Sequence, residues 1–68
     1  MKLADVHEGA VLRDEQGCEW RVVRRWGQRI GGWGDGGRWI EGADVALVDG
    51  AGRREVDDLD VSGWEVVP

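Results

Sequence analysis

A tryptophan-rich stretch interrupted by glycines constrains the fold most. Residues 19–41 read EWRVVRRWGQRIGGWGDGGRWIE and hold four of the five tryptophans. Side chains of a β-strand point alternately to two faces, and this period places Trp20, Val22 and Trp26 on one face. Arg24 falls on the same apolar face, which predicts a bend or β-bulge near it. Tryptophan and valine favour strands, and the glycines after Trp26 would end a helix. The stretch therefore predicts two strands joined by a glycine-rich loop.

Further strand patterns follow, separated by turn signals. Asp14 to Gly17 has the composition of a tight hairpin turn, and Gly50 to Gly52 makes another. The acidic residues 57–60 suit a turn or a single 3₁₀ turn, and residues 1–9 look like a lead-in arm. In the last strand, Trp64 and Val66 should face the core. The predicted strands cover residues 10–14, 18 or 19 to 26, 38–41, 44–49, 53–56 and 64–67.

These patterns predict an all-β fold in one domain spanning residues 1–68. About five or six short strands with regular turns and no credible helix suit a small barrel or sandwich. We expect a small SH3-like five-stranded barrel whose closure removes exposed strand edges, with a glycine-rich loop at residues 27–38. An OB-like barrel and a small β-sandwich are the alternatives. At 68 residues the core is marginal, so each buried tryptophan matters.

The composition points to a protein without a cofactor, soluble in the cytoplasm of a host cell. Cys18 is the only cysteine, which excludes an intrachain disulfide and favours a reducing compartment. No apolar run approaches the ~20 residues that span a membrane, and no signal segment opens the chain. His7 and Cys18 lack companions at metal-ligand spacing, so no metal site is expected. The chain also offers no convergent acid, base or nucleophile, so no catalytic residue is assigned and an enzyme is not expected.

Charge is distributed unevenly along the chain. The total is −5, but residues 1–20 carry −3, residues 21–39 carry +4 and residues 40–68 carry −6. A basic centre between acidic flanks suits two interpretations. The charges can solubilise exposed faces and pair across strands, or they can attract a charged partner. An acidic C-terminal half clustered on one face would also suit a mimic of nucleic acid that inhibits a host protein.

A resemblance adds to this interpretation. The run Gly9-x-Val11-Leu12-Arg13-Asp14-x-x-Gly17-x-x-Trp20, with Ser62-Gly63-Trp64 downstream, resembles small uncharacterised β-barrel proteins encoded by actinobacterial phages. The shared pattern covers about the first third of the chain and its last strand. The resemblance implies a phage accessory protein of unknown role.

The glycine-rich loop predicts a binding tip. Tryptophan and arginine are frequent energetic anchors of protein interfaces. Trp33 has glycine on both sides, and it either forms an exposed tip or folds back over the open end of a barrel. Gly32 to Gly37 also satisfies G-x-G-x-x-G, but a dinucleotide fold needs a helix after this motif and a strand is expected there, which strongly disfavours phosphate binding. The residues predicted to bind a protein are Trp33, Arg29, Arg38 and Asp35.

Two alternatives to protein binding stay open. Arginines interleaved with tryptophans are also the combination that holds single-stranded nucleic acid, although a net charge of −5 opposes it. The third alternative is a structural virion or homo-oligomer component with tryptophans between subunits. The function favoured is a phage accessory protein that binds a host or phage protein without catalysis, for example as an inhibitor. The candidates for nucleic-acid binding, within the Trp/Arg stretch 20–39, are Arg21, Arg24, Arg25, Trp26 and Trp39.

Overall fold

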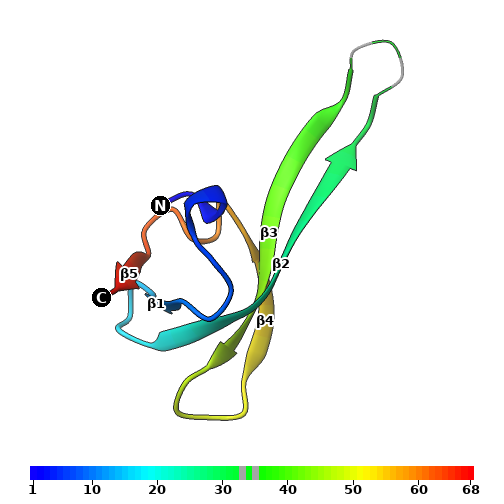
Figure 1. Cartoon of the computed structure of the whole chain (residues 1–68). Helices are drawn as coiled ribbons and strands as arrows, with labels where there is room; N and C mark the ends of the chain where they lie inside the picture. The colour runs from blue at the N-terminus through cyan, green and yellow to red at the C-terminus, as the bar shows by residue number, and fades with distance from the viewer. Residues whose placement is uncertain (33, 35) are drawn as a thin grey trace.

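The chain forms one five-stranded antiparallel sheet, which confirms the predicted all-β class. The structure is a computed structural model that describes residues 1–32, 34 and 36–68. The strand order is β4-β3-β2-β1-β5 (Figure 1). A single 3₁₀ turn is the only helical segment among the described residues. The elements are η1 (Leu3–Asp5), β1 (Val11–Arg13), β2 (Glu19–Ile30), β3 (Arg38–Leu47), β4 (Arg53–Asp57) and β5 (Glu65–Val67).

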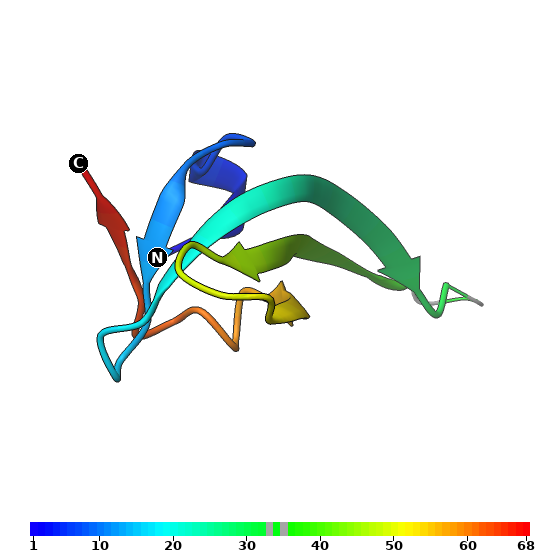
Figure 2. The same ribbon diagram turned by 90° about the horizontal axis from the view of Figure 1, so that it is seen from below.

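The sheet is barrel-like but open. Successive strands from β1 to β4 pair as antiparallel neighbours, and β5 returns to pair with β1. The two end strands, β4 and β5, do not pair with each other in the described part of the chain. Figure 2 shows β2 as a long arch that runs from its pairing with β1 to the far end of its hairpin with β3. The expected closure of the barrel was therefore wrong, while the five-stranded arrangement is confirmed.

The core lies on the inner face of the curved sheet and is sealed by the N-terminal segment. Leu3 is fully buried and Val6 is nearly so, because η1 turns them towards the sheet. The backbone N–H of Leu3 donates to Asp58 Oδ1 at 2.8 Å, which ties this segment to the turn after β4. Leu3 and Val6 thus belong to the core, so residues 1–9 are not the predicted lead-in arm. The buried core residues are Leu3, Val6, Leu12, Trp20, Val22, Ala43, Val45, Val56, Val61 and Trp64.

The first hairpin turn forms as its composition predicts. Asp14 Oδ1 accepts hydrogen bonds from the backbone N–H groups of Gln16 and Cys18, each at 2.9 Å. Gly17 adopts a φ of 87°, which glycine allows without strain. An aspartate at the start of a turn and a glycine at its end therefore fix the connection from β1 to β2.

The second hairpin is longer and more regular than predicted. β2 continues through Gly27 to Ile30, so a strand replaces the first part of the loop predicted at 27–38, while β3 begins at Arg38 as predicted. β3 runs unbroken from Arg38 to Leu47, whereas the sequence pattern predicted two strands separated near Gly42. Glycine is normally unfavourable inside a strand because it has no side chain to pack. Both interior glycines are covered by tryptophan rings, as described below.

We call residues 24–30 of β2 and 38–41 of β3 the arm, and the rest of the described chain the body. β1 pairs with β2 only as far as Arg21, and β4 pairs with β3 only as far as Gly42. The outer part of the arm, residues 27–30 and 38–41, is therefore a two-stranded ribbon that projects from the body (Figures 1 and 2). The molecule is correspondingly elongated, with principal extents of 45 × 20 × 19 Å.

The last strand shows how the open sheet affects burial. Trp64 is buried, as predicted, although it lies just before β5. Val66 pairs with Leu12 and so lies on the inner face, but it is 49% exposed. Because β5 is an edge strand, the core does not extend beneath it. The prediction that Val66 is a core residue was therefore wrong.

Candidate functional site

A β-bulge decides which side chains the arm presents on each face. Val22 pairs with Val45, but the next pair joins Arg24 to Asp44, so Val23 is the extra residue. This confirms the bulge predicted near Arg24. One extra residue reverses the faces of everything after it. Trp26 consequently lies on the outer face, opposite the core face that Trp20 occupies, and the prediction that they share a face was wrong.

Trp26 is fixed on the outer face of the arm. Its ring lies over its cross-strand partner Gly42, where any β-carbon would clash with it. Its indole N–H donates to Asp44 Oδ1 at 3.2 Å, and Arg24 Nε donates to Asp44 Oδ2 at 3.2 Å. One carboxylate thus holds both side chains. Trp26 is half-buried as a result, and Gly42 is buried beneath it.

Trp39 is fixed on the opposite face of the arm and is much more exposed. Its ring covers Gly27, which lies diagonally across the hairpin, and again a β-carbon would clash with it. Its indole N–H donates to Glu41 Oε1 at 2.9 Å. The side chain nevertheless remains 62% exposed. A large apolar ring is therefore held in one orientation while most of its surface stays in water.

Arg25 anchors the arm to the body. Its Nη2 donates to Glu41 Oε2 at 2.9 Å and its Nη1 to the carbonyl oxygen of Val6 at 2.6 Å. Its backbone N–H donates to Glu8 Oε2 at 3.0 Å. Glu41 therefore links the Arg25 guanidinium to the Trp39 indole. These contacts leave Arg25 unavailable to a ligand, although its Nε is buried without a partner among the described residues.

Among the described residues, no strand pairs with either edge of the arm, so both edges present unpaired backbone groups. In an antiparallel pair, alternate residues direct their N–H and C=O groups to opposite sides. The backbone N–H of Arg25 points away from β3, towards Glu8. The backbone groups of Gly27 and Arg29 therefore point to this same edge of β2. The backbone N–H of Leu47 donates to the carbonyl oxygen of Gly52, on the β4 side of β3. By the same alternation, the backbone groups of Trp39 and Glu41 point to that side, where β4 has already ended. Unpaired edges are ready templates for another strand.

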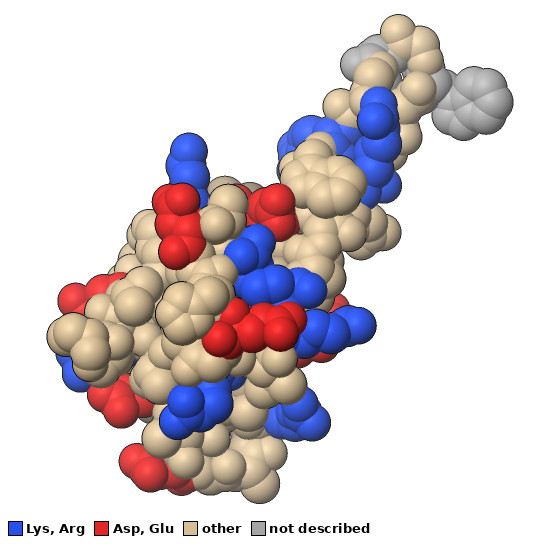
Figure 3. Space-filling view, viewed as in Figure 1, with Lys and Arg blue, Asp and Glu red and all other residues tan. Residues whose placement is uncertain are grey.

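The charge of the arm differs from that of the body. In the space-filling view of Figure 3, basic and uncharged side chains cover the outer part of the arm, while acidic side chains lie on the body and near the base of the arm. Carboxylates of the C-terminal half lie on both faces of the sheet: Glu41 is on the inner face, and Asp44 and Glu55 are on the outer face. No one-sided acidic surface results, so we do not propose mimicry of nucleic acid.

The predicted protein-binding residues are brought together only in part. Arg29 and Arg38 are both exposed, near the outer end of the arm, and Arg29 Nη2 donates to the carbonyl oxygen of Gly36. Arg38 lines a cavity of about 120 Å³ with Trp39 and residues of the turn after β4. The other two predicted residues, Trp33 and Asp35, lie outside the described residues.

The residues of the nucleic-acid alternative do not form one surface. Trp26 and Trp39 lie on opposite faces of the arm and cannot both stack on one strand of bases. Arg21 Nη1 donates to the carbonyl oxygen of Gly9 at 3.1 Å, while Arg24 and Arg25 bind carboxylates. Three of the predicted cations are therefore occupied within the protein.

The residues that fix the two tryptophans were not among the predicted site residues. These are Gly27, Glu41, Gly42 and Asp44. The sequence did contain a signal. Trp26 and Gly27 lie on one side of the predicted hairpin and Trp39 and Gly42 on the other, so each ring can cover a glycine on the opposite strand. Aromatic residues are known to stabilise strand glycines in this way.

Comparison with known proteins gives no match. The chain matches no protein-family model, no curated protein and no solved structure. Within the described ranges, no three or more His, Cys, Asp or Glu side chains are grouped to hold a metal ion. The same part of the chain has no helix long and apolar enough to cross a membrane. The physical properties of the arm are therefore the basis for a functional proposal.

Proposed function

We propose that this protein is a non-catalytic protein-binding module, an accessory protein of a phage, that engages its partner through the arm. The observation that carries the proposal is Trp39, which is 62% exposed yet held by Gly27 and Glu41. Tryptophan is the residue most enriched at the energetic centres of interfaces. A ring that is already oriented loses little conformational freedom on binding, so more of its burial contributes to affinity.

The surroundings of Trp39 extend the apolar contact. The cavity beside it is also lined by Ile40 and Leu59, and the Leu59 side chain is 79% exposed. Arg38 borders the same cavity and supplies donors for a partner's carbonyl or carboxylate groups. The combination of tryptophan, aliphatic side chains and arginine is typical of the centre of a protein interface.

The open edge of β3 indicates the form of the partner segment. β4 ends opposite Gly42, and the backbone groups of Trp39 and Glu41 face the space beyond it. An extended segment placed there would continue the line of β4 and bond to β3 as an added strand. Its alternate side chains would cover the Trp39 ring and enter the cavity beside Leu59. We therefore propose an extended segment of another protein, from the host or the phage, as the ligand.

Affinity capture with matched variants tests this function. Tagged protein is used to capture partners from an actinobacterial host lysate, and the affinity of the recovered partner is then measured with purified components. We expect Trp39→Ala to weaken binding by at least about tenfold, as hot-spot truncations do. Val66→Ala removes another exposed apolar side chain, from β5 at the far end of the sheet, and should bind normally.

The contradicting result is a partner bound equally well by the wild-type protein and Trp39→Ala. Thermal unfolding of both variants serves as the folding control. Trp39 contributes little to the core, so its removal should leave the body folded. Equal binding by a folded Trp39→Ala protein would show that the arm face is not the interface.

A further inference from the structure

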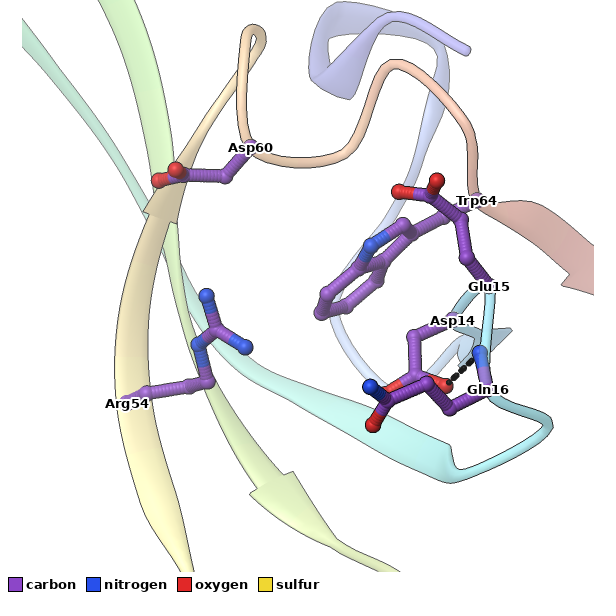
Figure 4. Close-up of a pocket in the computed structure, with 6 residues that line it drawn as sticks. All are labelled: Asp14, Glu15, Gln16, Arg54, Asp60 and Trp64. Carbon is purple, nitrogen blue, oxygen red and sulfur yellow. Dashed lines mark hydrogen bonds between the residues drawn. The ribbon is translucent and has the colours of Figure 1, made fainter.

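A second feature of the surface lies on the body, away from the arm. A cavity of about 300 Å³ opens between the β1–β2 turn, strand β4 and the segment that leads into β5 (Figure 4). It combines an aromatic ring with carboxylates and a single guanidinium group. Its lining residues are Asp14, Glu15, Gln16, Arg54, Asp60 and Trp64.

The floor of this cavity is the ring of Trp64, which stacks on Trp20 in the core. The ring centroids of Trp20 and Trp64 are 6.1 Å apart and their planes meet at 23°. Both residues are more than nine-tenths buried, so the pair is a rigid part of the core. The indole N–H of Trp20 donates to Asp14 Oδ2 at 3.1 Å, which locks that ring from the side of the turn.

Arg54 already places a cation on this floor. Its Cζ atom lies 5.7 Å from the centroid of Trp20 and 5.5 Å from that of Trp64, within the range of a cation–π interaction. Within the described part of the chain, the Arg54 guanidinium forms no hydrogen bond and no ion pair. Arg54 is also exposed. The guanidinium is therefore held by the rings and by the nearby charge of Asp14, and it can leave without breaking a hydrogen bond or a direct ion pair.

Polar groups with unused bonding capacity border the rings. The Glu15 carboxylate lies against Gly63, next to Trp64, and accepts no hydrogen bond from the described residues. Asp60 engages only one of its oxygens, Oδ2, which accepts the backbone N–H of Asp57. The indole N–H of Trp64 donates to none of the described residues. Its nitrogen is not fully buried, so water reaches it.

From this arrangement we infer that the cavity binds the basic side chain, arginine or lysine, of a polypeptide, in competition with Arg54. The ligand's cation would take the place of the Arg54 guanidinium on the rings, with Glu15 and Asp60 as its acceptors. The Trp64 N–H would donate to a carbonyl group of the ligand's backbone. An anionic ligand for Arg54 is disfavoured, because three carboxylates line the same cavity.

This site is independent of the function proposed for the arm. Trp39 and the Trp20–Trp64 pair belong to different parts of the molecule, and no residue lines both cavities. A protein that has lost its arm contact should still bind a cation at the body. Likewise, a negative result at the body leaves the proposal for the arm intact.

A titration followed by NMR tests the inference. The probe ligand is N-acetyl-arginine amide, which carries one guanidinium and no carboxylate, and the readout is the indole N–H resonance of Trp64. We expect a saturable shift with a Kd on the order of 1 mM, typical of a ligand this small. Arg54→Ala should tighten binding by about two- to fivefold, the effect of removing a competing exposed cation–π contact. Glu15→Gln and Asp60→Asn should each weaken it.

Matched variants separate local effects from general charge effects. Arg53→Ala removes the same charge from the neighbouring position of β4, which faces the opposite side of the sheet, and should leave Kd unchanged. Glu55→Gln is the corresponding control for the carboxylates. The uncharged analogue N-acetyl-norvaline amide should cause no saturable shift of Trp64. The inference is overturned if the Trp64 resonance does not respond in Arg54→Ala, or if the uncharged analogue gives the same response.

Discussion

The Trp39 ring lies on Gly27 of the opposite strand and occupies the space that a β-carbon there would need. The same relationship recurs between Trp26 and Gly42 on the other face of the hairpin. Each glycine leaves room for a ring, and each ring replaces the packing that the glycine lacks. Two reciprocal pairs of this kind account for an ordered ribbon that extends beyond the body.

The contact between Trp26 and Gly42 gives a direct prediction about stability. Gly42→Ala should lower the free energy of unfolding by about 1–3 kcal/mol, because the new β-carbon displaces the Trp26 ring and its hydrogen bond to Asp44. Urea denaturation followed by circular dichroism measures this change. Gly50→Ala is the matched control: its β-carbon would lie 3.4 Å from the nearest atom of Leu47. It should be neutral or slightly stabilising. Equal stability of Gly42→Ala and Gly50→Ala would contradict the packing.

The N-terminal segment gives a second prediction. Leu3 is fully buried, so Leu3→Ala should lower the free energy of unfolding by about 2–5 kcal/mol. Leu59→Ala removes the same atoms from a side chain that is 79% exposed, and should change stability by less than about 0.5 kcal/mol. Thermal unfolding of the two variants provides the comparison. A Leu3→Ala protein as stable as Leu59→Ala would mean that the segment does not seal the core.

The base of the arm gives a third prediction, on local exchange of amide hydrogens. The N–H of Arg25 faces an open edge but donates to the Glu8 carboxylate. Glu8→Ala should therefore speed its exchange by about three- to tenfold, the effect of losing one net hydrogen bond. Exchange at Val45, in the buried centre of β3, should not change. If the Arg25 amide exchanges equally fast in both proteins, Glu8 does not protect the edge.

The first turn makes stability depend on pH. Hydrogen bonds from the Trp20 indole, then from the backbone N–H groups of Cys18 and Gln16, lower the pKa of Asp14 below its ordinary value of 3.8. A carboxyl group with a lowered pKa in the folded state stabilises the protein above its unfolded pKa. That contribution is lost as the pH falls through the folded value.

Asp14→Asn tests this dependence. The variant should be less stable than the wild-type protein at pH 7, and the difference should shrink as the pH falls below about 4. Urea midpoints measured between pH 7 and pH 2 give both quantities. Asp49→Asn changes an exposed carboxylate and controls for net charge. A difference in stability between the wild-type protein and Asp14→Asn that stays constant down to pH 2 would contradict the role assigned to the Asp14 carboxylate.

Local signals in the sequence predicted the turns and the strand content well. Asp14 and Gly17 define the first turn by their own chemistry, and Arg24 on an apolar face correctly indicated the bulge. The strand predicted at residues 53–56 forms and extends to Asp57, and the turn predicted at residues 57–60 forms at residues 58–60. Each of these features depends on residues close together in the chain.

Features that depend on contacts between distant residues were not predicted. Gly27 and Gly42 suggested a loop and a break, and only the rings across the hairpin reveal them as strand positions. The bulge was foreseen, but its consequence for Trp26 depends on which residue is extra, and pairing with β3 decides that. The contacts of the predicted binding residues were not foreseen for the same reason. The arginines nearest the body bind carboxylates and carbonyl groups that lie far away in the sequence, so they are not available to a ligand.

The most direct test of the account is the contact between the Trp39 ring and Gly27 in the free protein. We predict nuclear Overhauser effects between the indole Hζ2 of Trp39 and the α-hydrogens of Gly27, which should also resonate upfield because they lie under the ring. This result would show that the arm is formed and its tryptophan oriented before any partner binds. Absence of these effects, with Gly27 at the shifts of an unstructured chain, would contradict the preformed arm.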